Sequence, residues 1–127
     1  MSIPLSLLVQ YQFSGFFGGI RNPPTLNPAN AGSTVSLTFS LSGNWGLNVF
    51  ASDFPKSQQI NCTTKAPIGS ATSTATPPGN PFSYNATTDR YTYPWKTLKP
   101  SYTGTCRQFI LQLKENSAPR VVYFRFS

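Results

Sequence analysis

The segment from Ile3 to Phe13 alternates between apolar side chains and mostly polar or neutral ones along its whole length. The apolar positions recur at every second residue: Ile3, Leu5, Leu7, Val9, Tyr11 and Phe13. A period of two places these side chains on one face of a β-strand, whereas a helix would scatter them around its axis. An apolar face of this length must be covered, either by the chain's own sheets or by a neighbouring molecule.

The same alternation recurs downstream in short runs separated by turn signals. Between Ser33 and Gly43 an apolar face alternates with a face of Ser and Thr. Further strands are expected at 45–50, 58–63, 81–84, 90–96, 105–114 and 121–127. The glycines among aromatic residues at 15–19 predict a bend or a close backbone approach, and the three prolines within 21–32 predict an edge or crossing segment. The spacing is typical of one Ig-like antiparallel β-sandwich of about seven to nine strands.

Two local features qualify this pattern. Pro94 lies inside the run from Arg90 to Lys96 and predicts an edge position or a bulge, because proline cannot donate to a sheet ladder. Residues 64–80 consist mainly of Ser, Thr, Ala, Pro and Gly. We expect this stretch to be a mobile surface loop.

The two cysteines are Cys62 and Cys106. In an all-β chain of this composition they predict one disulfide, with two buried free thiols as the alternative. A bond between them closes a loop that contributes about 4 kcal/mol on the chain-entropy estimate. A disulfide would imply an oxidising compartment and favours a secreted or cell-surface protein. No apolar run approaches a membrane span and no signal peptide is visible, so any leader would lie outside this sequence.

Charge narrows the function classes. Only 10% of the residues are charged, and the net charge is +7 because Asp53, Asp89 and Glu115 are the only acidic residues. The ten basic residues are spread singly along the chain. This distribution favours solubility or loose attraction to anionic polymers, and we expect no specific nucleic-acid binding.

The sequence offers little for catalysis. It contains no histidine, which removes the commonest general base and the commonest metal ligand. The three carboxylates lie far apart in sequence, and no glycine motif precedes a helix that could hold a phosphate. We therefore expect no catalytic residue, no metal site and no cofactor.

Two groups of residues are weaker candidates for sites. Tyr91, Tyr93 and Trp95 could stack on a sugar, although alternating aromatic residues more often pack on a sheet. Asn61 and Asn85 begin the sequons Asn-Cys-Thr and Asn-Ala-Thr and are possible glycosylation sites, with Asn85 in the more accessible turn.

Several segments together resemble a known family. They are YQFSGFF at 11–17, NPPTLN at 22–27, AGSTVSLTFSLSGNWGLNVF at 31–50, YTYPWKT at 91–97 and GTCRQFILQL at 104–113. Their order resembles the small PxKF-type domain found at the ends of large secreted bacterial proteins. The name-giving motif is altered, because Ser36 and Thr38 stand where the family has Pro and Lys. The resemblance implies an extracellular, non-catalytic Ig-like module in which Cys62 and Cys106 match the family's cysteine pair.

The resemblance begins at Tyr11 and divides the chain. We expect residues 11–127 to form the sandwich, with Tyr11 and Phe13 in its first strand, and residues 1–10 to form an apolar strand extension. The expected function is a non-enzymatic, self-assembling extracellular protein that polymerises head to tail by donating this strand. The expected subunit-interface residues are Ile3, Leu5, Leu7, Val9 and Tyr11. The alternative is a monomeric cell-surface adhesion module or a module that binds polysaccharide.

Overall fold

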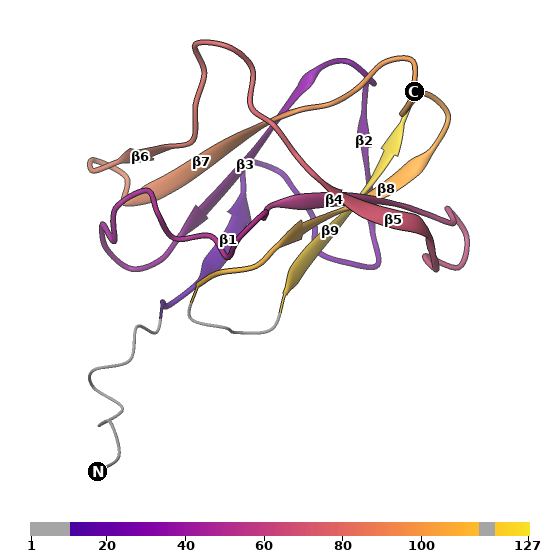
Figure 1. Ribbon diagram of the computed structural model, residues 1–127. Helices are drawn as coiled ribbons and strands as arrows, with labels where there is room; N and C mark the ends of the chain where they lie inside the picture. The colour runs from indigo at the N-terminus through magenta and orange to yellow at the C-terminus, as the bar shows by residue number, and fades with distance from the viewer. Residues whose placement is uncertain (1–10, 115–118) are drawn as a thin grey trace.

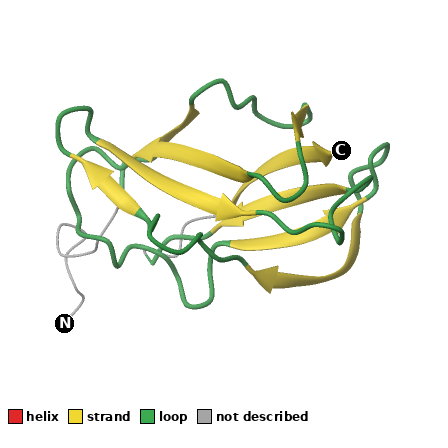
Figure 2. Ribbon diagram, turned by 90° about the horizontal axis from the view of Figure 1, so that it is seen from above, coloured by secondary structure: helices red, strands yellow, loops and turns green. Residues whose placement is uncertain are grey.

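A computed structural model describes residues 11–114 and 119–127, which form two β-sheets packed face to face (Figure 1). The strands, in chain order, are β1 (Ser14–Phe17), β2 (Leu26–Ala29), β3 (Thr34–Ser40), β4 (Lys56–Ile60), β5 (Pro67–Ser73), β6 (Ser83–Asn85), β7 (Arg90–Lys96), β8 (Cys106–Leu111) and β9 (Arg120–Phe126). No helix occurs in this part of the chain, and Figure 2 shows only strands joined by loops. The predicted all-β sandwich is confirmed.

The first sheet has the order β1-β3-β7-β6 and is antiparallel throughout. β3 and β7 form its centre, with Thr34 opposite Lys96 and Phe39 opposite Tyr91. β1 comes so close to β3 that a Cβ at Gly15 would lie 3.0 Å from the Cβ of Phe39. Gly15 also has a φ of +140°, so glycine permits the close approach that the glycine–aromatic run predicts.

The second sheet has the order β2-β9-β8-β4-β5. β1 and β2 therefore lie in different sheets, and the proline-rich segment between them crosses from one to the other, as predicted. β2 runs parallel to β9, which departs from the fully antiparallel sheets expected from sequence. The remaining pairs in this sheet are antiparallel. The sandwich therefore consists of a four-stranded and a five-stranded sheet.

The core fills the space between the sheets with aromatic side chains. Trp95 is fully buried, and its ring centroid lies 5.3 Å from that of Phe109 and 5.6 Å from that of Phe124. Except for Val35, which is partly buried, the alternating apolar positions are buried: Leu37, Phe39, Leu41, Phe109, Leu111, Leu113, Val122, Phe124 and Phe126. The period-two pattern thus identified the core of both sheets.

The strand predicted at 45–50 is wrong. This stretch is a loop in which only Phe50 forms a bridge, to Leu113. A strand would place Leu47 and Val49 on one face, but Leu47 is 52% exposed whereas Val49 is buried. The Tyr91 hydroxyl holds the start of the loop, because it accepts from the Trp45 amide at 2.8 Å and donates to the Gly46 carbonyl at 2.9 Å.

The mobile loop predicted at 64–80 is also wrong in part, because its middle forms β5. β5 pairs with β4, with Lys56 opposite Ser73 and Gln59 opposite Ile68. All but one of its residues are exposed, so the strand has no apolar face and no alternation to detect. β5 forms because β4 offers a free edge, which a local sequence pattern does not reveal.

Pro94 occupies the edge position predicted for it. β6 pairs with β7 only from Arg90 to Thr92, so Pro94 lies beyond the end of β6. Further along, the Lys96 amide donates to the Ala75 carbonyl at 2.9 Å. β7 is therefore without a neighbouring strand on this side over its second half.

The predicted disulfide joins Cys62 and Cys106, whose Cα atoms lie 5.3 Å apart. Cys62 follows the end of β4 and Cys106 begins β8, where it lies opposite Ile60. The bond therefore links neighbouring strands of one sheet and does not connect the two sheets.

Candidate binding edge and pocket

β5 is the most open edge of the described sheets. It has seven residues, whereas the other edge strands, β1, β2 and β6, have four, four and three. No residue from Pro67 to Ser73 is charged. An exposed, uncharged edge presents backbone N–H and C=O groups to which another strand can pair.

A bulge divides β5 into two paired ends. The register shifts between Ser57 and Gln59, which lie opposite Thr72 and Ile68 respectively. The residues between Ile68 and Thr72 therefore outnumber those opposite them on β4. Bulges twist an edge and interrupt its ladder, so a partner strand would find regular backbone near Thr72 and Ser73.

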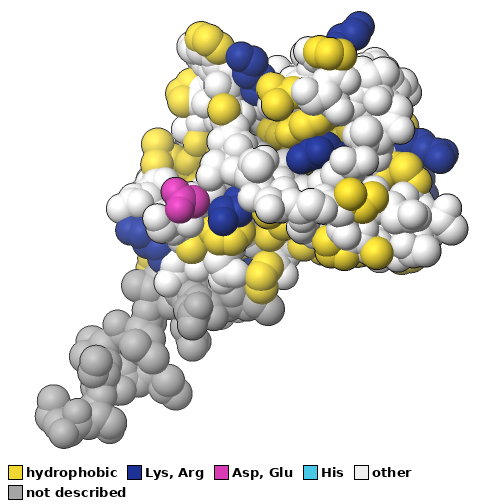
Figure 3. Space-filling view, turned by 45° about the vertical axis from the view of Figure 1, so that its right-hand side comes forward, with side chains coloured by type: hydrophobic (Ala, Val, Ile, Leu, Met, Phe, Trp, Pro, Cys, Tyr) yellow, Lys and Arg dark blue, Asp and Glu magenta, His cyan; other side chains and the backbone are white. Residues whose placement is uncertain are grey.

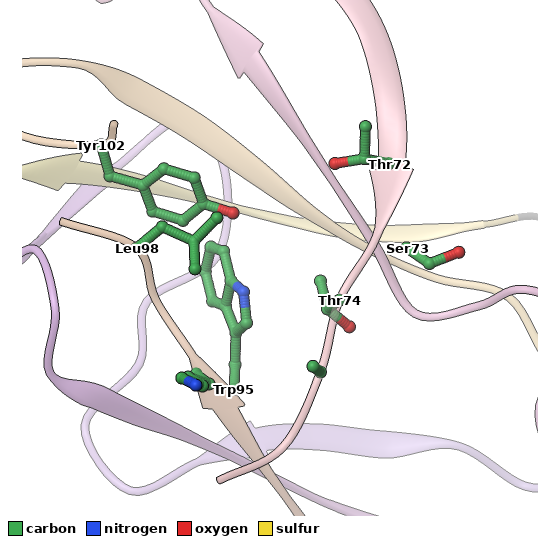
Figure 4. A pocket seen from close by; sticks show the side chains of 8 residues that line it. Thr72, Ser73, Thr74, Trp95, Leu98 and Tyr102 are labelled. Atoms are coloured by element: carbon green, nitrogen blue, oxygen red, sulfur yellow. The ribbon is translucent and has the colours of Figure 1, made fainter. Parts of the chain in front are cut away.

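A pocket of about 170 Å³ lies at this second end of β5, facing the unpaired half of β7 (Figure 4). It is lined by Thr72, Ser73, Thr74, Ala75, Trp95, Lys96, Leu98 and Tyr102. A cavity of about 150 Å³ can hold a benzene molecule, so this space suits one apolar side chain or a similarly small group.

Trp95 contributes an unpaired donor to the pocket wall. Its indole Nε1 is buried and has no hydrogen-bond partner. In Figure 4 the nitrogen-bearing edge of the ring faces the segment that carries Thr72 and Thr74. An unpaired buried N–H costs roughly 1–3 kcal/mol, so a hydrogen-bond acceptor placed here would be stabilised.

The rear of the pocket is held by a polar cluster. Arg107 stacks over the Tyr102 ring at 4.1 Å and donates from Nε to the Ser57 hydroxyl at 2.7 Å. The Tyr102 hydroxyl also donates to Ser57, at 3.4 Å. Ser57 and Tyr102 are both buried, so these contacts fix the position of the tyrosine ring beside the pocket.

The front of the pocket is tied to neighbouring segments. The Thr74 hydroxyl donates to the Pro55 carbonyl at 2.8 Å and accepts from the Tyr93 hydroxyl at 2.8 Å. Burial raises the pKa of the Tyr93 hydroxyl. Ser73 donates to the Asp53 carbonyl at 2.9 Å. Backbone bonds add to these contacts, because the Thr74 amide donates to the Pro55 carbonyl at 3.0 Å.

A second polar cluster surrounds Asp89, away from the pocket. Its carboxylate accepts hydrogen bonds from the Tyr84 hydroxyl at 2.6 Å, the Gly43 amide at 3.0 Å and the Ser40 hydroxyl at 3.3 Å. The Tyr84 bond is the main cause that lowers the pKa of Asp89, and the same bond raises the pKa of Tyr84 to about 12. Three donors of the chain itself already point at the Asp89 carboxylate, so we assign this cluster a structural role.

The predicted sugar-stacking residues do not form a platform. Tyr91, Tyr93 and Trp95 are 0%, 6% and 0% exposed. All three point from β7 into the core, so their ring faces contact other rings instead of solvent. The sugar-stacking prediction at these positions is therefore wrong, and the alternative, packing on the sheet, holds.

The predicted subunit-interface residues fall mostly outside the described chain. Ile3, Leu5, Leu7 and Val9 lie in residues 1–10, which the structure does not describe. Tyr11 is described and belongs to the chain's own core, where its ring meets that of Trp45 edge-on at 5.3 Å. Its assignment to a subunit interface is therefore wrong, and it also precedes β1, which begins at Ser14.

Both sequon asparagines lie at exposed turns. The Asn61 Oδ1 accepts the amides of Thr63 and Thr64 at 2.8 and 2.9 Å. The Asn85 Oδ1 accepts the amide of Thr87 at 2.9 Å. Glycosylation at either position stays a prediction, which these turn geometries leave sterically open.

Charged and metal-binding groups do not converge within the described residues. No group of three or more His, Cys, Asp or Glu side chains in this part of the chain could hold a metal ion. Figure 3 shows Lys and Arg side chains set apart from one another, with hydrophobic side chains between them. Across residues 11–114 and 119–127 no helix has the length and apolar character needed to cross a membrane.

Sequence reasoning missed most of the pocket. Thr72 and Thr74 lie in the stretch that was expected to be a mobile surface loop, and no site was predicted at Leu98. Their convergence depends on β5 pairing with β4, which brings the end of β5 opposite β7. The clearest sequence signal was Pro94, because a proline within β7 indicates that β6, the strand beside it, ends before this position.

Comparison with known proteins adds no relative: no family model matches the chain, and no curated protein or solved structure matches it either.

Proposed function

We propose that this chain is a non-catalytic extracellular structural protein that assembles head to tail by strand donation. In each junction, the apolar N-terminal segment of one copy would pair with the open edge of β5 in the next. A backbone ladder would supply affinity, and alternate side chains would supply specificity.

The open edge of β5 is the observation that carries this proposal. It is the longest edge strand among the described residues, it is uncharged, and its side chains are exposed. Natural proteins usually protect such edges with charged side chains or a covering segment. The segment at 3–9 has the complementary property, because its alternating apolar residues form a strand face that needs a partner.

The ends of the sandwich suit a chain of copies. Ser14 pairs with Ser40 at one end of β3, whereas Trp95 pairs with Val35 near the other. These β3 positions are about 17 Å apart at roughly 3.3 Å per residue. Tyr11 therefore lies toward the end opposite the pocket, and head-to-tail contacts that do not close produce a filament.

Light scattering over a range of protein concentrations tests the proposal. The full chain should form polymers, and a variant that begins at Tyr11 should be a folded monomer. Ile68→Lys, which places a charge on β5, should weaken assembly, whereas Leu47→Lys on the exposed loop should not. Polymers that persist in the shortened variant would exclude strand donation. A full chain that stays monomeric would favour the adhesion-module alternative.

A further inference from the structure

We infer that the pocket beside Trp95 receives one apolar side chain of the donated strand, while a backbone carbonyl of that strand accepts the Trp95 indole N–H. This inference rests on the proposed strand donation and names the contact that would anchor it. The occupant is the segment 2–10 of a second copy.

The size and chemistry of the pocket favour this occupant. Its volume of about 170 Å³ suits one side chain, and Lys96 is the only charged residue among those lining it. The walls are the apolar Leu98, the aromatic Trp95 and Tyr102, and short hydroxyl side chains. Residues 2–10 carry no charged side chain and supply several Leu, Ile and Val residues. Neutral apolar groups therefore match the site.

The unpaired indole selects for a carbonyl. Trp95 Nε1 is a donor only, and it lacks an acceptor although it is buried. An added strand brings one backbone carbonyl with each residue. The other tryptophan differs, because Trp45 Nε1 already donates to the Leu41 carbonyl at 2.9 Å. One indole is thus satisfied within the chain and the other is not.

The place of the pocket fits the geometry of strand addition. It adjoins Thr72 and Ser73, the end of β5 where the pairing with β4 is regular again after the bulge. Trp95 itself is fully buried, so a carbonyl reaches its N–H only when the segment from Thr72 to Ala75 moves outward. Strand addition at this end of β5 would act on that segment directly.

Indole NMR tests the inference. The variant that begins at Tyr11 retains the whole core cluster, which lies between Tyr11 and Phe126, and can be labelled with ¹⁵N-tryptophan. Its folding is checked first by circular dichroism. The probe is a synthetic peptide of residues 2–10, and the control peptide carries Leu5→Ser and Leu7→Ser. The Trp95 indole resonance should move downfield and saturate with the probe, while the Trp45 resonance stays in place and the control peptide has little effect.

Two matched variants test the pocket without altering Trp95. Leu98 and Leu47 are 47% and 52% exposed, but only Leu98 lines the pocket. Leu98→Arg should weaken peptide binding about tenfold or more, because burial of one apolar side chain contributes that much affinity. Leu47→Arg should leave binding unchanged.

The outcomes separate this inference from strand donation itself. If the full chain polymerises but the probe leaves the Trp95 resonance unmoved, the pocket contact is overturned and strand donation stands. The same conclusion follows if the indole already shows contact with a bound water and the probe does not displace it. If the probe moves the Trp95 resonance but the full chain never polymerises, the pocket contact is supported and assembly is overturned.

Discussion

Asp89 joins three segments through its carboxylate. It accepts from Tyr84 on β6, from Ser40 at the end of β3 and from the Gly43 amide in the following loop. Asp89 itself has a φ of +55°, in the left-handed region that aspartate tolerates better than most residues. A single side chain thereby ties the β6–β7 turn to the β3–β4 loop.

The Tyr84–Asp89 bond should make stability depend on pH at both extremes. The pKa of Tyr84 is raised to about 12 from 10.0, so its contribution is complete below pH 10 and is lost as pH rises toward 12. The pKa of Asp89 is lowered, so its contribution is present above its unfolded pKa of 3.8 and is lost as pH falls below that value. Tyr84→Phe should be less stable at neutral pH, with flatter pH dependence at both ends.

Urea unfolding measured across these pH ranges checks this prediction. Burial also raises the pKa values of Tyr91 and Tyr93, so some alkaline destabilisation should remain in Tyr84→Phe. Equal slopes of stability against pH in both proteins would show that the bond does not form in solution.

At the scale of elements, the period-two pattern predicted strands that bury one face and failed for segments without that constraint. β3 and β9 were recognisable because Leu37, Phe39, Phe124 and similar residues alternate with polar ones. β5 was missed because its residues are exposed and polar, so its pairing depends on the free edge of β4. The pocket was missed for the same reason, because the end of β5 forms one of its walls and β7 forms another.

The stretch at 45–50 shows the opposite error, because an apolar alternation there does not form a strand. Leu47→Ala should change the free energy of unfolding by less than about 0.5 kcal/mol, since an exposed side chain loses little on truncation. Val49→Ala should cost about 1–3 kcal/mol, because Val49 is 0% exposed. Chemical unfolding of both variants measures the difference. Similar costs for the two would mean that this stretch packs as the strand expected from sequence.

At the scale of the whole molecule, the fold follows from a few alternating strands, but the topology does not. The sequence predicted one sandwich and its core, and it indicated that the proline-rich stretch at 21–32 is an edge or crossing segment. It predicted antiparallel sheets, and the parallel pairing of β2 with β9 departs from that prediction because pairing direction is a tertiary property. A binding surface formed by the edges of strands is therefore harder to predict from sequence than a core formed by their apolar faces.

The disulfide gives the last prediction at this scale. Because it joins β4 to β8 within one sheet, the packing between sheets should not require it. The double variant Cys62→Ser, Cys106→Ser should fold to the same structure, with the aromatic bands of its near-ultraviolet circular dichroism unchanged. Its free energy of unfolding should fall by about 4 kcal/mol, because the unfolded chain regains the entropy of a loop with a sequence separation of 44.

Urea unfolding of the double variant, compared with the oxidised chain, measures this loss. The oxidised chain treated with a reductant is the matched control, because it lacks the bond but keeps both cysteines. The two should unfold at similar urea concentrations, since the serine hydroxyls replace thiols near the protein surface at Cys62 and inside it at Cys106. A loss below about 1 kcal/mol in both would mean that the denatured chain is already compact across this loop, and the entropic account would not hold.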